Sequence, residues 1–150
     1  MENYDADMEQ RVWQRIRGAE QPQEKSMQVL AAAELTEAAV HLMLSQQLQG
    51  KEKALLRTIF EDDQNHAACL KGIHYFTTDS TLSVRPVPPA PDAPVMALRK
   101  CYARKLRAQK EYESRASDPE YGSVFRQLAE DEGRHCKMIL QIAGSIKKPG

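Results

Sequence analysis

The chain has 150 residues and carries 21 basic and 21 acidic side chains, so its formal net charge is zero. No basic stripe with interleaved aromatic residues is present, which argues against a nucleic-acid partner. No apolar run reaches the ~18 residues of a membrane span, and the N-terminus lacks the apolar centre of a signal peptide. We therefore expect a cytoplasmic protein with no membrane segment.

A short amphipathic helix is predicted within residues 1–22. Its apolar residues recur at helical spacing: Met8, Val12, Trp13 and Ile16. Gly18 and Pro22 end this pattern. We expect the segment to cover one end of the folded domain, residues 23–150, or to form a subunit contact.

Two helices in close succession are predicted to open this domain. Residues 23–49 consist mainly of Ala, Leu, Glu, Gln and Met, which are strong helix formers, and Gly50 marks the end of the stretch. A second helix is predicted over residues 51–76. Because almost nothing separates the two helices, they should form an antiparallel hairpin.

An extended connection follows over residues 77–94. It contains Pro86, Pro88, Pro89, Pro91 and Pro94, which cannot lie in a helix interior. A third helix is predicted over residues 95–117. Asp118 and Pro119 then fit the N-cap and first position of a fourth helix that ends near residue 146. Two helical hairpins joined by one long connection predict an all-α four-helix bundle with a crossover.

The two halves of the chain resemble an internal repeat. Residues 59–63 and 128–132 each have an apolar pair followed by three acidic residues, and a histidine, His66 or His135, follows three residues later. One hairpin that was duplicated and then diverged explains this pattern.

Each repeat therefore contains a carboxylate and a histidine three residues apart. On a helix these positions share one face, so Asp63 with His66, and Glu132 with His135, can each direct an oxygen and a nitrogen to one point. The remaining acidic residues of the two motifs should lie in solvent or behind the ligands: Glu61, Asp62, Glu130 and Asp131. Carboxylate and imidazole are suitable ligands for iron, and facing pairs of this kind form di-metal centres in helical bundles.

The first and third predicted helices supply the remaining candidate positions. By the repeat alignment Glu34 is the first-helix ligand, and Glu37, one turn later, is the alternative. Lys105 occupies the position equivalent to Glu34. Tyr112 follows Lys105 by seven residues, and His41 is its counterpart in the first half.

With these motifs, residues 28–143 resemble the ferritin-like superfamily and, within it, the rubrerythrin-like group. The family pattern has a glutamate on the first helix of each half, often a tyrosine seven residues later, and a Glu-x-x-His motif on the second helix. Residues 128–135 match the latter motif closely. The first half departs from it, because Asp63 stands in the glutamate position and His41 in the tyrosine position.

The resemblance implies a ferritin-like bundle that binds one or two iron ions. Its metal ligands would be Glu34, Asp63, His66, Glu132 and His135. It also implies oxidoreductase activity, either peroxide reduction or ferrous iron oxidation, with Tyr112 as a catalytic hydrogen-bond donor or redox group. An external electron donor and a homodimer are implied as partners.

Lys105 is the main departure from this pattern. Its ammonium group would stand where the family has a second glutamate, could pair with Glu132 or Asp63, and could take the place of the second ion. Two alternatives follow. The chain is a metal-dependent oxidoreductase, or it is a degenerate bundle without catalytic metal that serves as a dimerisation or protein-interaction scaffold.

The cysteines Cys69, Cys101 and Cys136 form no C-x-x-C pair. We expect them to be reduced and buried, as is usual for cytosolic proteins.

Overall fold

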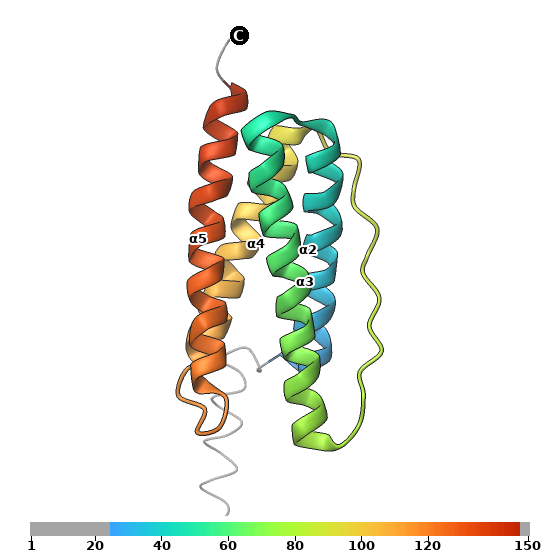
Figure 1. The fold of residues 1–150 in the computed structure, drawn as a ribbon, viewed down its shortest axis with the longest axis vertical. Helices are drawn as coiled ribbons and strands as arrows, with labels where there is room; N and C mark the ends of the chain where they lie inside the picture. Colours follow the sequence, from blue (N-terminus) through green and yellow to red (C-terminus); the bar gives the residue numbers. More distant parts are fainter. Residues whose placement is uncertain (1–24, 148–150) are drawn as a thin grey trace, which may run out of the picture.

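The computed structural model describes residues 25–147, which form four helices and no strands. The helices are α2 (Met27–Gln47), α3 (Gly50–Thr78), α4 (Pro94–Ser114) and α5 (Gly122–Lys147), shown in Figure 1. The prediction of an all-α fold is confirmed for this part of the chain. The amphipathic helix predicted within residues 1–22 lies outside the described residues.

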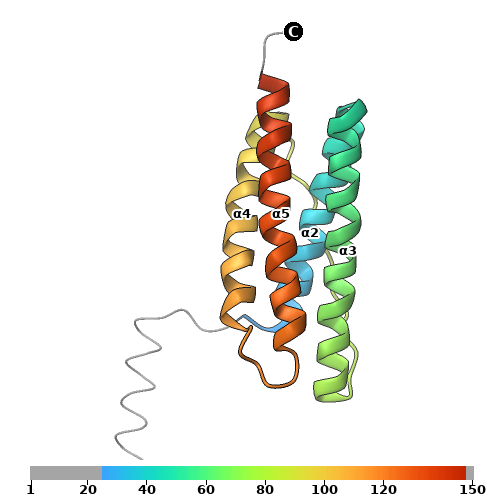
Figure 2. The same cartoon turned by 60° about the vertical axis from the view of Figure 1, so that its left-hand side comes forward.

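The helices pair as two antiparallel hairpins, α2 with α3 and α4 with α5 (Figures 1 and 2). The connection over residues 79–93 has no regular secondary structure and runs along the whole length of the bundle. As a result α4 points in the same direction as α3, and α5 points in the same direction as α2. The predicted crossover is therefore present.

Local chemistry explains most of the helix boundaries. The Ser26 side chain accepts a hydrogen bond from the backbone N–H of Val29 and caps α2. Gly50 has a φ of 64°, a left-handed conformation that a glycine adopts without steric cost, and it reverses the chain between α2 and α3. At the start of α4, Pro94 occupies the first turn, where its missing N–H is not needed.

The predicted start of the fourth helix is wrong by three residues. Asp118 does act as a cap, because its Oδ1 accepts the backbone N–H groups of Glu120 and Tyr121, but it caps a turn that precedes the helix. The helix itself begins at Gly122, where a Cβ atom would collide with the carbonyl oxygen of Ala116. Because the loop at Ala116 packs closely against Gly122, α5 begins at this glycine rather than at residue 119.

The interior of the bundle has three layers. One apolar cluster fills the end nearest the α2–α3 turn: Val40, Leu44, Leu56, Ile59, Ala97, Leu98, Cys101, Ile139 and Ile142. A second fills the opposite end: Leu30, Ala31, Leu70, Ile73, Tyr112, Phe125, Leu128 and Ala129. The layer between them consists of buried polar residues. Apolar packing therefore closes off this polar layer at both ends of the bundle.

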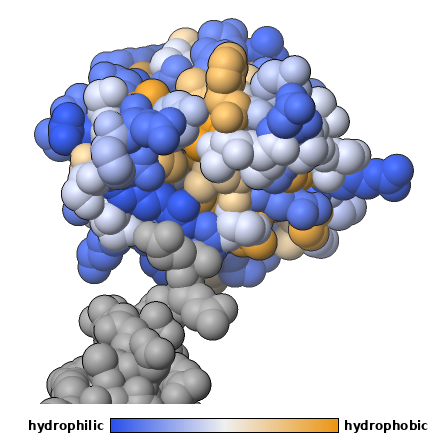
Figure 3. Space-filling model, turned by 90° about the horizontal axis from the view of Figure 1, so that it is seen from below, coloured by the Kyte–Doolittle hydropathy of each residue, from blue (hydrophilic) through white to orange (hydrophobic). Residues whose placement is uncertain are grey.

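The surface at the end where α5 begins is mostly hydrophilic, with a small apolar patch among polar side chains (Figure 3). Among the described residues, α2 is the one helix whose length and apolar composition would suit a membrane span. It also carries Glu34, Glu37 and His41, all buried in the bundle, so its apolar composition is accompanied by a polar inner face.

Candidate metal centre

The polar layer is built from all four helices, and each helix contributes two side chains. These residues, all 4% exposed or less, are Glu34 and His41 of α2, Asp63 and His66 of α3, Lys105 and Tyr112 of α4, and Glu132 and His135 of α5. The structure thus brings together every residue predicted for the site. Each pair recurs at helical spacing, which explains why all of them face the interior.

His66 contacts two buried carboxylates with the same ring nitrogen. Its Nδ1 is 3.1 Å from Glu34 Oε2 and 3.0 Å from Glu132 Oε1. Tyr112 donates a hydrogen bond of 2.7 Å to the same Glu34 oxygen. Four side chains each offer one ligand atom here, and the four atoms lie within 4.8 Å of one another: Glu34, Asp63, His66 and Glu132. Such a set has the size and chemistry to surround one cation.

The outer nitrogens of both histidines bind carboxylates of the opposite hairpin. His66 Nε2 lies 2.8 Å from Asp131 Oδ2, and His135 Nε2 lies 2.8 Å from Asp62 Oδ2. Each contact turns the Nδ1 of its ring towards the polar layer, as carboxylates commonly do for metal-binding histidines. The prediction that Asp62 and Asp131 lie behind the ligand residues is confirmed.

The buried ammonium group of Lys105 pairs with two carboxylates, as the sequence predicted. Its Nζ donates a hydrogen bond to Asp63 Oδ1 and lies 3.1 Å from Glu132 Oε2. Burial alone would lower the pKa of Lys105, but the charges of Asp63 and Glu132 outweigh it and raise that pKa well above the usual value. In turn, Lys105 and His41 outweigh burial at Asp63 and lower its pKa to about 2. This pair is therefore ionised at neutral pH.

His135 differs from His66 in lacking an inner partner. Its Nδ1 makes no hydrogen bond and lies 3.8 Å from Asp63 Oδ1. Burial and the nearby Lys105 charge lower the pKa of this imidazole, so the ring is neutral at pH 7. Its Nε2–H donates a hydrogen bond to Asp62, so Nδ1 carries a lone pair that faces the interior.

The buried charges around His66 and Lys105 nearly balance without any added cation. Burial lowers the pKa of His66, but its hydrogen bonds to Glu132 and Glu34 outweigh burial and raise the pKa to about 11. Burial is the main cause that raises the pKa of Glu34 to about 7. The positive charges of His66 and Lys105 are thus opposed by Asp63, Glu132 and a partly protonated Glu34. A metal ion bound here must displace the His66 proton.

The residues present fit one metal ion better than two. Three side chains already converge on one point: Glu34, His66 and Glu132. Tyr112 donates a hydrogen bond to Glu34, and Asp131 binds the outer nitrogen of His66. At the second position His135 offers a lone pair, but Lys105 holds the carboxylates that would complete the set. A second cation there would have to displace the ammonium group.

Glu37, the alternative to Glu34, does not face this group. Its carboxylate instead pairs with Arg104 and lies beside His41 and Cys101. Burial lowers the pKa of His41, but its hydrogen bond to Asp63 and the neighbouring Cys101 outweigh burial and raise the pKa to about 10. The sequence prediction missed Arg104 and this neighbouring cluster. The prediction of three buried cysteines is also wrong at Cys69, which is exposed on α3.

A surface pocket of about 380 Å³ between α2 and α4 reaches the polar layer. Its outer wall includes Val29 and Val87, both largely exposed, and its inner end includes Lys105, Tyr112 and Glu132. A small molecule can therefore approach the centre from this side.

Comparisons with known proteins gave no relative: no family model matches the chain, and neither the curated proteins nor the solved structures contain a match.

Proposed function

We propose that this chain is a ferritin-like, rubrerythrin-like protein that binds one iron ion in place of the usual two. The ligands are Glu34, His66 and Glu132, with Asp63 beside them, and the ammonium group of Lys105 takes the place of the second ion. The observation that supports this proposal is the buried pairing of Lys105 with Asp63 and Glu132.

The donor set supports iron. Carboxylate oxygens with one imidazole nitrogen suit ferrous and ferric ions, whereas soft metals prefer thiolates. The histidine is already turned inward by Asp131, and Tyr112 holds the inner oxygen of Glu34. These contacts reduce the reorganisation that binding would require.

The activity we propose is peroxide reduction, which requires an external electron donor, or ferrous iron oxidation, in which the ferrous ion is itself the electron source. Converting hydrogen peroxide to water takes two electrons and two protons, and an iron ion held by Glu34, His66 and Glu132 would supply one of the two electrons. The second electron must come from a separate partner. Tyr112 and the protonated Lys105 are the hydrogen-bond donors placed to orient a small oxidant that enters through the α2–α4 pocket. A cytoplasmic location and a homodimer belong to the same proposal.

Metal analysis tests the stoichiometry. Protein purified without chelator and reconstituted anaerobically with ferrous iron should contain one equivalent of iron. A Glu132→Gln variant should lose it, and Glu130→Gln, which changes an exposed neighbour on the same helix, should keep it. Lys105→Glu should raise the content to two equivalents, and Lys110→Glu, an exposed control on the same helix, should leave it at one.

A metal-free scaffold is the second candidate, and the charge balance of the polar layer favours it. Because His66 and Lys105 already neutralise the buried carboxylates, the bundle needs no cation for stability. No iron in the native protein after reconstitution, with uptake only in Lys105→Glu, would establish this scaffold and overturn the one-iron proposal. Two equivalents in the native protein would also overturn it.

A further inference from the structure

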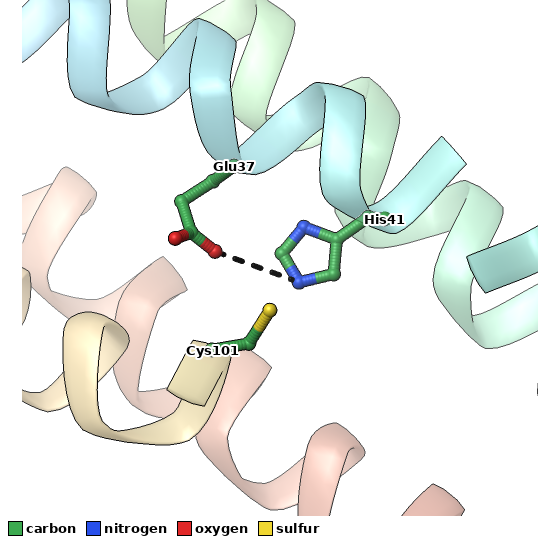
Figure 4. Close-up of side chains that lie close together, drawn as sticks. All are labelled: Glu37, His41 and Cys101. Carbon is green, nitrogen blue, oxygen red and sulfur yellow. Dashed lines mark ion pairs between the residues drawn. The ribbon is translucent and has the colours of Figure 1, made fainter. Parts of the chain in front are cut away.

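A second cluster of ligand-type side chains lies beside the polar layer, nearer the α2–α3 turn. It comprises Glu37 and His41 of α2 and Cys101 of α4 (Figure 4). All three side chains are buried, and one ligand atom from each lies within 4.8 Å of the other two. The side chains point towards one another across the space between the two helices.

Two of these ligand atoms have no hydrogen-bond partner. Neither Glu37 Oε2 nor His41 Nε2 makes a hydrogen bond, and they face each other as an ion pair at 3.9 Å (Figure 4). Buried polar atoms without partners are rare because each costs about 1–3 kcal/mol of folding free energy. Two such atoms that face each other and a cysteine sulfur indicate a position for a ligand that bonds to all three.

The hydrogen bonds around the cluster leave its inner atoms free. His41 Nδ1 lies 2.9 Å from Asp63 Oδ2, so the carboxylate holds the ring with Nε2 directed at Glu37 and Cys101. This carboxylate–histidine pairing is the usual support of a metal-binding imidazole. Arg104 Nε donates a hydrogen bond to the other Glu37 oxygen, Oε1, and Arg104 Nη2 lies 3.4 Å from Cys101 Sγ.

The geometry points to a zinc site formed by Glu37 Oε2, His41 Nε2 and Cys101 Sγ, separate from the proposed iron site. Zinc bonds of about 2.0–2.3 Å in a tetrahedral arrangement place neighbouring ligand atoms roughly 3.3–3.6 Å apart. Glu37 Oε2 and His41 Nε2, now 3.9 Å apart, would approach each other by about half an ångström. Cys101 Sγ, within 4.8 Å of both, would move by little more than about 1 Å at most. One nitrogen, one oxygen and one sulfur ligand suit zinc, and three protein ligands leave a fourth position for water.

The proton balance of binding is simple. The Cys101 thiol and the Nε2 of a protonated His41 each release a proton to solvent as they bond to the ion. Glu37 brings a carboxylate that pairs with Arg104. An ion with two positive charges is then matched by the thiolate and the carboxylate. Arg104, whose side chain is 38% exposed, forms part of the wall of two surface pockets that α2 and α4 line together. Its displacement would open a path for the ion.

Cobalt is the probe that distinguishes this site, because a cobalt–thiolate bond gives an intense charge-transfer band that oxygen and nitrogen ligands do not. We expect the reduced, chelator-treated full-length chain to bind one equivalent of Co²⁺ with this band and to lose the band when zinc is added. Cys101→Ser should abolish the band and weaken zinc binding by at least ~100-fold. Cys136→Ser, a buried cysteine outside the cluster, should retain both.

A third variant separates this site from the proposed iron site. Glu132→Gln should remove the iron ligand set but leave the cobalt–thiolate band unchanged. His41→Gln should remove the band, and circular dichroism should show native helix content in all variants. Absence of the band from the native protein, or its persistence in Cys101→Ser, would overturn the zinc site without bearing on the iron proposal.

Discussion

Lys105 of α4 donates a hydrogen bond to Asp63 of α3 at a depth where neither side chain is more than 1% exposed. This contact bridges the two hairpins and neutralises a carboxylate that would otherwise require a cation or a proton.

Removing the ammonium group should destabilise the protein. In Lys105→Met, Asp63 and Glu132 lose their shared partner, and breaking a buried ion pair by removing one member costs about 3–5 kcal/mol. Lys110→Met, on the exposed face of the same helix, should change stability by less than ~0.5 kcal/mol. Urea unfolding of metal-free protein measures both. A loss under 1 kcal/mol for Lys105→Met would contradict the pairing described here.

The same contact predicts a loss of stability in acid. The pKa of Asp63 is lowered to about 2 in the folded protein, against about 3.9 in an unfolded chain. Its contribution is therefore present above pH 4 and is lost as the pH falls from about 4 towards 2, and it amounts to roughly 2 kcal/mol. The free energy of unfolding between pH 6 and pH 2.5 should fall less steeply in Asp63→Asn than in the native chain. Equal slopes would refute the assignment.

His66 and His135, whose rings stack with centroids 5.8 Å apart, should differ in protonation in the metal-free protein. The pKa of His66 is raised to about 11, so its ring should carry both protons at pH 8, whereas His135 should be neutral with its proton on Nε2. Stability contributed by the charged His66 ring is complete below about pH 6.5 and declines as the pH rises towards 11. Nitrogen-15 NMR of the imidazole rings measures both states, and a neutral His66 at pH 8 would contradict this prediction.

Tyr112 should act mainly by holding Glu34. Tyr112→Phe removes a hydrogen bond of 2.7 Å to Glu34 Oε2, and we expect a loss of about 1 kcal/mol in stability. If Glu34 binds iron, the affinity should fall about tenfold because the carboxylate loses its support. Tyr102→Phe on the same helix, outside the polar layer, is the matched control. Equal iron affinity in both variants would exclude this role for Tyr112.

Gly50 and Gly72 should respond in opposite directions to substitution by alanine. Gly50 has a φ of 64°, so Gly50→Ala should cost about 1 kcal/mol. Gly72 lies within α3 with open space around its Cα, so Gly72→Ala should stabilise the protein by up to ~1 kcal/mol. Thermal unfolding of the two variants provides the comparison, and destabilisation by both would show that the turn conformation is not the cause.

Much of the architecture follows from periodicity. Helix-forming residues, the glycine turn and the proline-rich connection predict two hairpins and a crossover, and the repeated motif predicts which side chains share the interior. Lys105 was identified because the repeat aligned it with Glu34. These predictions succeeded because positions three, four or seven apart on a helix share a face whatever the helix packs against.

Some features that depend on contacts between hairpins were not predicted, among them the cluster of Glu37, His41 and Cys101. Glu37 and His41 are four residues apart on α2, and Cys101 precedes Lys105 by four residues on α4, so a common inward face for each pair could have been inferred. Their meeting depends on the rotation of α2 relative to α4, which the sequence pattern does not determine. The start of α5 was missed because a loop contact at Gly122, rather than the capping residue Asp118, decides it.

The crossed contacts of His66 with Asp131 and of His135 with Asp62 have a consequence for folding. Each histidine is oriented by a carboxylate that belongs to the other hairpin. A single hairpin therefore carries candidate ligand residues without the carboxylates that orient them, so the site is complete only when the two hairpins pack together. We expect assembly of the site to be coupled to closure of the bundle, so that any ligand bound at the site also stabilises the association of the two hairpins.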